Sequence, residues 1–413
     1  MADKDGELSD IIAGAVCLPK VFIAELIRFG GVHTCPVHPE PRQEHKDKMT
    51  ADHLETIMAA RMAAMKREGK HPSKSVPRRI CQDVSVPQGS YIRCHLHPKR
   101  FPAVYSVRWE DRVVEVTDTY VVINKPAGCP VVPAVDNILE CVMHQAAEAI
   151  GWPEPLMVTH RLDQCTEGLV VLGKTGAFVK YFNALLRDKA DSVVKVYRTL
   201  TFTPPQLGQL VHYVTTGNRS PGEPSHTIAY DHEVQSSQRS ELEVLKCSKV
   251  ALTGVAREKW GSTAFESELR LITGRTHQIR AQLGAVGCAL AGDSLYTPVP
   301  GEVREGNVLT DGSRRLAEPQ DGIGLQAYQL KVGCNACKGS SSIACRALSD
   351  EWLHRACRCS MQRALWGQLS LRLAPLGGGA EGGCTLTALV CLHFNEASPG
   401  IRCSIHLVVC TFV

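Results

Sequence analysis

The amino-acid sequence predicts an α+β fold for residues 105–332, with a mixed, largely antiparallel central sheet and flanking helices. Two observations predict it. Strand-like segments outnumber helical ones in this region, and the two kinds do not alternate strictly, as they would around a parallel sheet. The flanking regions, residues 1–104 and 333–413, have different patterns.

The strand-like segments of residues 105–332 are short runs rich in Val, Ile, Leu and Thr. Three other segments place apolar residues at helical spacing, and the last ends at Gly287, a residue suited to helix termination. Residues 214–239 are rich in Gly, Pro and Ser, which predicts a long surface excursion. The expected strands are residues 113–118, 120–125, 169–174, 195–202, 241–246 and 266–274, and the expected helices are residues 136–151, 176–189 and 275–287.

Residues 1–104 predict a small N-terminal domain. Residues 18–40 have the pattern of an amphipathic helix that is ended by Gly30 and Gly31 and followed by a strand. Residues 81–97 alternate like a pair of strands around a Pro-Gln-Gly turn at 87–89.

Residues 41–80 interrupt this domain with a basic insertion. They contain ten Lys or Arg and five Asp or Glu, a local net charge of about +5. Asp52 and Glu55 have capping-box spacing, and a helical stripe follows. This helix either packs the stripe on its neighbour or serves as an arm that contacts phosphates. The stripe consists of Leu54, Met58, Met62 and Met65.

The composition is that of an ordinary globular protein, with 413 residues, a hydrophobic share of 44% and a net charge of +4. The acidic start and the lack of a long apolar run predict a soluble intracellular protein, cytoplasmic or nuclear, and leave an organelle open. Nine of the 18 cysteines fall within 334–410. Because this stretch has no clear period, we expect a disordered or poorly packed tail over residues 333–413.

Cysteine and histidine clusters raise the question of zinc. The tail carries a C-x-x-C at 334–337 with Cys357 and Cys359 beyond it, but this spacing fits no ordinary zinc finger. Two further clusters lie in the N-terminal region, where alternate strand positions give the same spacing. We therefore expect no metal site. The N-terminal clusters are His33, Cys35 and His38, and Cys94, His95 and His97.

Three stretches concentrate residues that could do chemistry. A KPAG turn at 125–128 follows a strand; HRLDQCTEG at 160–168 places Asp163 in a Gly-bearing turn; and GRTHQIR at 274–280 crowds donors at a helix start. Taken singly, each has an ordinary structural explanation. A lone turn aspartate is usually a cap or a surface charge.

Together, these stretches resemble the RluA-type RNA pseudouridine synthases. Five motifs occur in the family's order: KPAG at 125–128, HRLD-x-x-T-x-G at 160–168, K-x-Y at 195–197, GRTHQIR at 274–280 and GD-x-x-Y at 292–296. The resemblance implies an enzyme that breaks the bond between ribose C1' and uracil N1, turns the base and rejoins it through C5, without a cofactor. It also implies that residues 1–104 are a degenerate ribosomal-protein-like RNA-binding domain.

The resemblance assigns roles to individual residues. Asp163 is the essential carboxylate, as nucleophile or as base; Arg280 holds it ionised; and Tyr197 stacks on the base. Arg161 enters the RNA stack when the uridine is flipped out. Further RNA contacts are expected from His160, Lys125, Arg275, His277 and Gln278, although His277 and Gln278 are expected mainly to hold the backbone of their motif. The expected partner is RNA, either tRNA or rRNA, and the expected state is a monomer.

Two departures from the family pattern bear on activity. Glu167 replaces the usual Ser, and we expect its side chain to point to solvent. After Val332 the family's closing segment is replaced by the Cys-rich tail. One alternative is therefore an RNA-binding protein that keeps the fold without efficient catalysis. Another is a metal-binding regulatory protein, which rests only on the Cys and His clusters.

Overall fold

The computed structural model describes residues 2, 5–36, 38–41, 43–47, 49–68, 76–188, 193–216, 226–296 and 322–334, and short strands at 304–305, 308–309, 339–344, 386–388 and 410–412. It divides into two units, Met1–Ala356 and Cys357–Val413. In the second unit, β19 (Leu386–Ala388) pairs antiparallel with β20 (Cys410–Phe412). Most of the expected tail, including Cys337, Cys357 and Cys359, lies outside the described residues.

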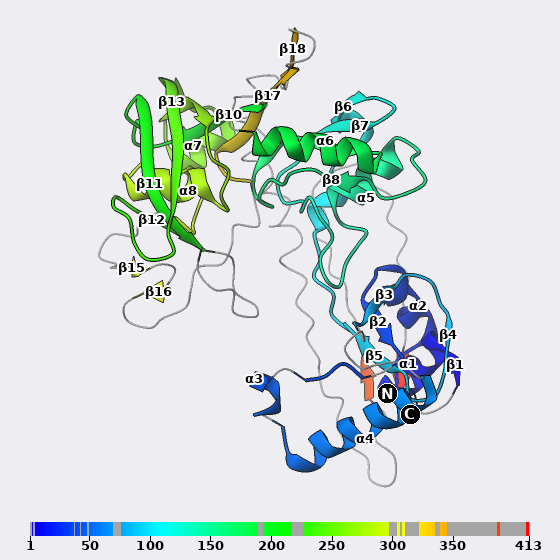
Figure 1. Ribbon diagram of the computed structural model, residues 1–413. Coiled ribbons are helices and arrows are strands. Elements are labelled where there is room, and N and C mark those ends of the chain that lie inside the picture. The colour runs from blue at the N-terminus through cyan, green and yellow to red at the C-terminus, as the bar shows by residue number, and fades with distance from the viewer. Residues whose placement is uncertain are drawn as a thin grey trace. The chain divides into compact units, whose positions relative to one another are not determined.

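The described strands of the first unit include an 11-stranded sheet, ordered β12-β11-β13-β14-β10-β17-β9-β7-β6, with β8 beside β9 and β18 beside β17 (Figure 1). The β17–β9 pair is parallel and the other pairs are antiparallel. This topology confirms the predicted α+β fold. The strands are β6 (Val113–Val116), β7 (Tyr120–Lys125), β8 (Met157–Val158), β9 (Glu167–Gly173), β10 (Val193–Thr201), β11 (Gly208–Thr216), β12 (Thr227–Tyr230), β13 (Gln238–Ala251), β14 (Thr263–Leu271), β17 (Leu325–Cys334) and β18 (Gly339–Ala344).

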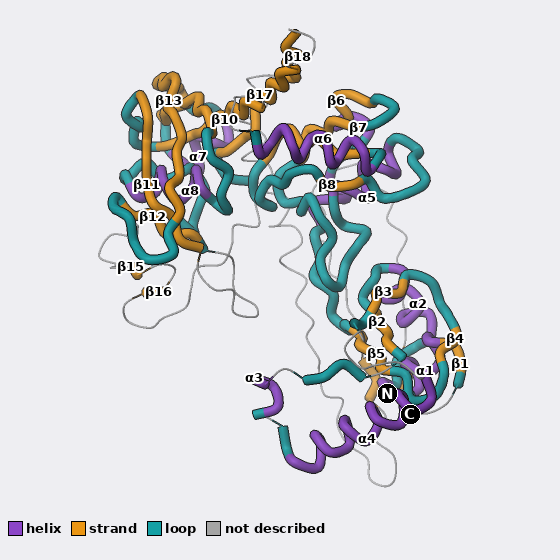
Figure 2. The backbone as a smooth tube through the Cα atoms, viewed as in Figure 1, coloured by secondary structure: helices purple, strands orange, loops and turns teal. Residues whose placement is uncertain are grey.

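Both faces of this sheet are buried at β7 and β9, because successive side chains of a strand point to opposite faces. Val122, Leu169 and Val171 pack with Phe182 of α6 (Gly176–Arg187) on one face. The intervening residues of both strands join the main core on the other face, together with α5 (Val142–Ala149). Figure 2 shows α6 as a continuous helix running alongside the strands. The sandwiched strands provide a rigid base for the turn that precedes β9.

Several expected elements of this region differ in extent, among them the helix at 136–151 and the excursion at 214–239. The helix expected at 136–151 begins only at Val142, because Asn137 and Glu140 use their side chains elsewhere: Asn137 donates to the Lys99 carbonyl, and Glu140 accepts from the Phe101 amide. The excursion expected at 214–239 holds β12, which pairs with β11, and the start of β13. The other described helices here are α7 (Gly254–Trp260) and α8 (Gln278–Ala285).

Outside the insertion, the described residues of the N-terminal region form helices α1 and α2 and two small sheets. The helix that ends near Gly30 is confirmed: α2 stops at Arg28, Gly30 has φ +79°, and β2 follows. The strand pair expected around 87–89 is wrong, because the two strands join different sheets: β4 pairs with β1, and β5 pairs with β2. The elements are β1 (Gly6–Glu7), α1 (Leu8–Val16), α2 (Lys20–Arg28), β2 (Val32–Cys35), β3 (Arg78–Ile80), β4 (Ser85–Val86) and β5 (Tyr91–Cys94).

The insertion forms α3 (Gln43–Lys46) and α4 (Ala51–Glu68). The buried face of α4 differs from the predicted stripe, since Met58 and Met62 are exposed at 38% and 67%. Ile57 and Arg61 are buried instead, and Arg61 donates to the His38 carbonyl. The buried face of α4 is therefore offset by one residue from the predicted face. It includes the guanidinium group of Arg61, which is hydrogen-bonded, in place of a methionine.

The N-terminal Cys and His clusters do meet in space, since the rings of His33 and His95 lie 5.7 Å apart. Burial, with Arg93 and Arg79 nearby, lowers the pKa of His33 to about 4. Within the described ranges, no group of three or more His, Cys, Asp or Glu residues is placed to hold a metal ion. No helix in the same ranges is long and apolar enough to cross a membrane.

Candidate active site

The turn that carries Asp163 joins β8 to β9 and is bonded back to β9. The hydroxyl of Thr159 donates to the Val171 carbonyl at 2.6 Å, and the Val171 amide donates to Nε2 of His160 at 3.1 Å. Burial, with Lys195 nearby, lowers the pKa of His160 to about 3, so the ring stays neutral and can accept. His160 also borders the cavity described below, and its expected RNA contact stays a prediction.

The side chain of Lys125 is fully buried beneath this turn. Its Nζ donates to the carbonyls of Pro126, Gln164 and Thr166 at 3.0, 3.0 and 2.7 Å. The amide of Gly128 also donates to the Gln164 carbonyl. Its three ammonium donors are therefore used inside the protein, and its RNA contact stays a prediction that the burial of the side chain does not support. The lysine instead ties the KPAG turn to the segment that follows Asp163.

Gly168, at the start of β9, marks the closest approach of two strands. It has φ +121°, and a Cβ added there would lie 2.3 Å from the Ala327 carbonyl oxygen of β17. This contact belongs to the parallel β17–β9 pair. The motif therefore requires glycine at this position for both conformation and space.

A second turn, at 273–277, leads into α8 and faces the Asp163 turn. Gln278 is buried; its Oε1 accepts from the Thr273 hydroxyl and the Arg275 amide, and its Nε2 donates to the Glu241 carbonyl. These contacts agree with its expected role of holding the backbone of the motif. His277 caps α8 with φ +52°, the left-handed region.

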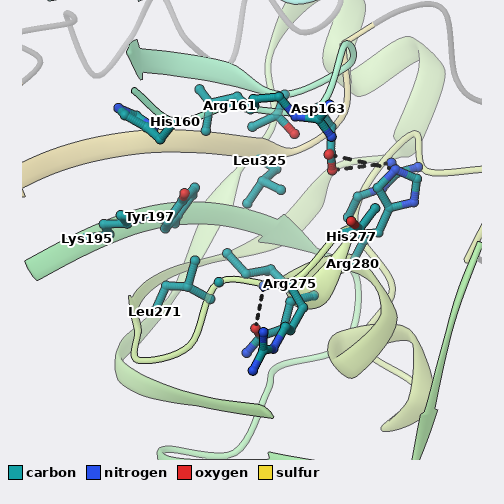
Figure 3. A pocket seen from close by; sticks show the side chains of 16 residues that line it. His160, Arg161, Asp163, Lys195, Tyr197, Leu271, Arg275, His277, Arg280 and Leu325 are labelled. Atoms are coloured by element: carbon teal, nitrogen blue, oxygen red, sulfur yellow. Dashed lines mark hydrogen bonds and ion pairs between the residues drawn. The ribbon is translucent and has the colours of Figure 1, made fainter. Parts of the chain in front are cut away.

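Asp163 faces two cationic or proton-bearing partners from α8 (Figure 3). Its Oδ2 lies 3.6 Å from Nη1 of Arg280, and its Oδ1 lies 3.7 Å from Nε2 of His277. Arg280 is fully buried and also donates to Asp293, from Nε at 2.7 Å and from Nη2 at 2.9 Å. The structure thus brings Asp163 and Arg280 together, as the resemblance implied, but the contact of Arg280 with Asp293 is shorter.

These groups line a cavity of about 260 Å³ between the two turns. Tyr197 and Lys195 enter it from β10, and Leu271 and Leu325 add apolar walls. Burial, and to a lesser degree the charge of Asp163, raises the pKa of the Tyr197 hydroxyl, which is therefore neutral at physiological pH. Burial lowers the pKa of Lys195.

Two exposed arginines border the same cavity. Arg161 precedes Asp163 in its turn, and Arg275 lies in the turn before α8. Of the nine residues proposed for the site from sequence, eight border this cavity and Lys125 does not.

Two expectations about this site need revision. Glu167 does not point to solvent: it is buried, and its Oε1 lies 4.0 Å from Nη1 of Arg112. Asp293, the principal partner of Arg280, received no role from the sequence. The signal was present, because Asp293 and Tyr296 are the polar positions of the GD-x-x-Y motif.

Comparison with known proteins agrees with this geometry. The sequence profile described as RNA pseudouridylate synthase matches residues 119–285, which include both turns. A protein of Arabidopsis thaliana named RNA pseudouridine synthase 6, chloroplastic, is 33% identical over 363 residues, covering 79% of this chain and 75% of that protein. The chain belongs to the RluA-type RNA pseudouridine synthase family. As a member of this family, it is an isomerase that converts uridine in RNA to pseudouridine.

Two further relatives extend the family assignment. The synthase is 36% identical over 310 residues to the protein of the same name from Oryza sativa subsp. japonica, covering 72% of this chain and 63% of that protein. It is 27% identical over 191 residues to the ribosomal large subunit pseudouridine synthase D of Pseudomonas aeruginosa, covering 45% of this chain and 53% of that protein.

Proposed function

We propose that Asp163 is the essential carboxylate of this synthase, and that it acts at the sugar of a flipped uridine as nucleophile or as base. The observation that carries the proposal is its ion pairing with buried Arg280 at the wall of a cavity. A buried guanidinium favours the ionised form of a carboxylate and fixes its orientation. Either role requires an ionised oxygen near C1' of the ribose.

Tyr197 supplies the flat contact for the uracil. Its ring lines the cavity, and its hydroxyl is neutral in this buried site. A tyrosine face stacks on any base and leaves the ring edges free for bonding. The base must turn about its axis between cleavage and reattachment, and a stacking surface permits that rotation.

Arg161 and Arg275 are the proposed contacts to the RNA outside the cavity. Both side chains are exposed at its rim, where phosphates of a flipped nucleotide would lie. His277 and Gln278 are proposed to hold the backbone of the turn that carries Arg275. Residues 1–104 are proposed as a further RNA-binding region, and the synthase is proposed to act as a monomer.

The proposed substrate is ribosomal RNA of the large subunit, because the relative from Pseudomonas aeruginosa carries that substrate in its name. The names of the two plant relatives favour an organelle over the cytoplasmic or nuclear location expected from sequence. Mapping of pseudouridines lost from rRNA and tRNA when the synthase is depleted would decide between these RNA classes. Imaging of a C-terminally tagged full chain would report the location.

The alternative of an RNA-binding protein without catalysis rests on the altered segment after Val332. β17, which runs from Leu325 into that segment, lies between β10 and β9 and contributes Leu325 to the cavity. The presence of β17 in the sheet and of Leu325 in the cavity wall supports catalysis, because the strand that precedes the altered segment is in place. The test measures tritium release from uracil C5 of labelled RNA by the full chain, and binding without release would favour the alternative.

A further inference from the structure

Tyr296 contacts both partners of Asp163. Its hydroxyl lies 3.0 Å from Nδ1 of His277, and its ring centroid lies 5.1 Å from the guanidinium carbon of Arg280. The same residue closes the GD-x-x-Y motif, to which the proposed function gives no role. One side chain is therefore placed to influence both groups that face the carboxylate.

We propose that Tyr296 is a positioning residue for the reaction: its hydroxyl fixes the proton of His277 on Nε2, where it faces Asp163, and its ring supports the guanidinium of Arg280. The inference rests on the proposed role of Asp163. It adds a residue that acts on the carboxylate only through its neighbours.

The proton of His277 can be assigned from its surroundings. Nε2 lies 3.7 Å from the Asp163 carboxylate, and a bare nitrogen lone pair directed at an anion is repulsive. Asp163 therefore favours a proton on Nε2, and a hydroxyl that donates to Nδ1 adds to this preference. In a neutral imidazole the other nitrogen, Nδ1, is then an acceptor, so the Tyr296 hydroxyl donates to it.

The second contact to the Tyr296 oxygen agrees with this direction. The amide of Thr227 in β12 donates to that oxygen at 3.1 Å, which occupies a lone pair and leaves the hydroxyl proton for His277. The Thr227 hydroxyl donates to the Thr276 carbonyl, beside His277. Thr227 of β12 is thus bonded both to Tyr296 and to the residue before His277.

Tyr296 has a further close neighbour at its ring and another at its backbone. His226 stacks on it, with centroids 5.4 Å apart and an interplanar angle of 14°. On α8, a Cβ at Gly284 would approach the Tyr296 carbonyl oxygen to 3.0 Å, so a larger residue there would displace Tyr296. These contacts constrain the orientation of the ring. They thereby hold the hydroxyl toward His277 and one ring face toward Arg280.

The direct test is the tautomer of His277. The full chain, labelled with ¹⁵N in histidine, is measured by NMR at about pH 8, where an ordinary neutral imidazole is expected. We expect the Nε2–H tautomer in the wild type and a mixture of tautomers in Tyr296→Phe. A wild-type Nδ1–H tautomer, or an identical His277 spectrum in the variant, would overturn the proposal. His277→Gln assigns the signal.

The kinetic test uses an rRNA transcript with tritium at uracil C5. Tyr296→Phe keeps the ring and removes one hydrogen bond, so we expect kcat to fall roughly tenfold or more, with KM within about twofold. Tyr120→Phe is the matched control, since it removes a hydroxyl bond to Glu115 away from the cavity and should leave both constants unchanged. Equal behaviour of the two variants, or a change confined to KM, would contradict the positioning role.

Two substitutions of His277 separate positioning from folding. The Gln amide can replace the Nε2 donor, whereas the shorter Asn reaches only the Nδ1 position; Asn, however, better tolerates a left-handed backbone. We expect His277→Gln to retain more activity than His277→Asn. The melting temperature of His277→Asn should nevertheless equal or exceed that of His277→Gln. The opposite order of activity would overturn the proposal. If the wild type releases no tritium, the proposed function fails, while the NMR result still decides the tautomer.

Discussion

Arg280 and Asp293 form an ion pair in which neither side chain is exposed to solvent. Two guanidinium nitrogens, Nε and Nη2, donate to the carboxylate of Asp293, and Nη1 is left facing Asp163. Asp293 thus fixes the plane of the guanidinium, and that plane directs the third nitrogen at Asp163. The carboxylate that we propose as catalytic thus faces a guanidinium group that is itself held by buried Asp293.

Breaking this pair should destabilise the synthase. Asp293→Ala leaves Arg280 buried without its main partner, and loss of one member of a buried pair typically costs about 3–5 kcal/mol in the free energy of unfolding. Urea unfolding measures this loss. Asp231→Ala is the control, because Asp231 pairs with His232 on the exposed surface. Similar losses in both variants would argue against a structural role for the buried pair.

Substitution of Gly168 should disturb the base of the Asp163 turn. In Gly168→Ala the new Cβ would meet the Ala327 backbone, and overpacking of this kind costs about 1–3 kcal/mol in the free energy of unfolding, with backbone strain in addition. Gly176→Ala is the matched control. A Cβ added at Gly176 would have no neighbouring atom within 4 Å, and this residue is the first of α6. Thermal melts compare the two, and an unchanged Gly168→Ala would show that the strands can separate without loss.

The buried Lys125 should make stability depend on alkaline pH. Burial lowers its pKa from 10.5 to about 8, so between these values the unfolded chain binds more protons than the folded one. Stability from this group therefore rises with pH across that window, by about 3 kcal/mol in total. Relative to Lys125→Met, the wild type should gain that amount from pH 8 to 10.5 in urea titrations. Lys249→Met, on the exposed surface, should show no such difference. If the difference in stability between the wild type and Lys125→Met does not change with pH, the lowered pKa of Lys125 is refuted.

Glu167 should support the charge of this lysine. Its carboxylate is one of several nearby groups, with Cys129, Cys165 and Asp163, that raise the pKa of Lys125 against the larger effect of burial. Glu167→Gln removes that charge, so Lys125 should titrate below about 8. NMR of ¹³C-labelled lysine follows the titration, with Lys125→Met to assign the signal. Glu115→Gln should not move it, and an unchanged or higher pKa in Glu167→Gln would be inconsistent with this role.

The strands and the motif turns could be predicted from sequence because their signals are local. Val121 to Ile123 and Leu169 to Leu172 are apolar runs, and Gly287 and Gly30 mark helix ends with their positive φ values. Pairing was not predictable in the same way: β4 and β5 flank one turn yet join different sheets, because each finds its partner far along the chain. The missing first turn of α5 has a similar cause, since Glu140 bonds to Phe101.

The site divides along the same line. Motif order indicated Asp163, Arg280 and Tyr197, whose side chains the structure brings to one cavity. Sequence did not reveal which motif residues face inward. Lys125 and Gln278 look like surface donors in a string of letters, but their partners are backbone carbonyls and amides that only the fold brings near. Glu167 was misjudged for the same reason, because Arg112 lies far from it in sequence.

In the proposed mechanism, Asp163 carries out the chemistry, while Arg280 only holds its carboxylate in place. The most direct measurement is tritium release from uracil C5 of labelled rRNA by the wild type and by Asp163→Asn, with unfolding in urea as the check on folding. We expect release by the wild type, none detectable from Asp163→Asn, and closely similar unfolding curves, because Asn matches Asp in shape. Release by Asp163→Asn at the wild-type rate would contradict the proposed role of Asp163.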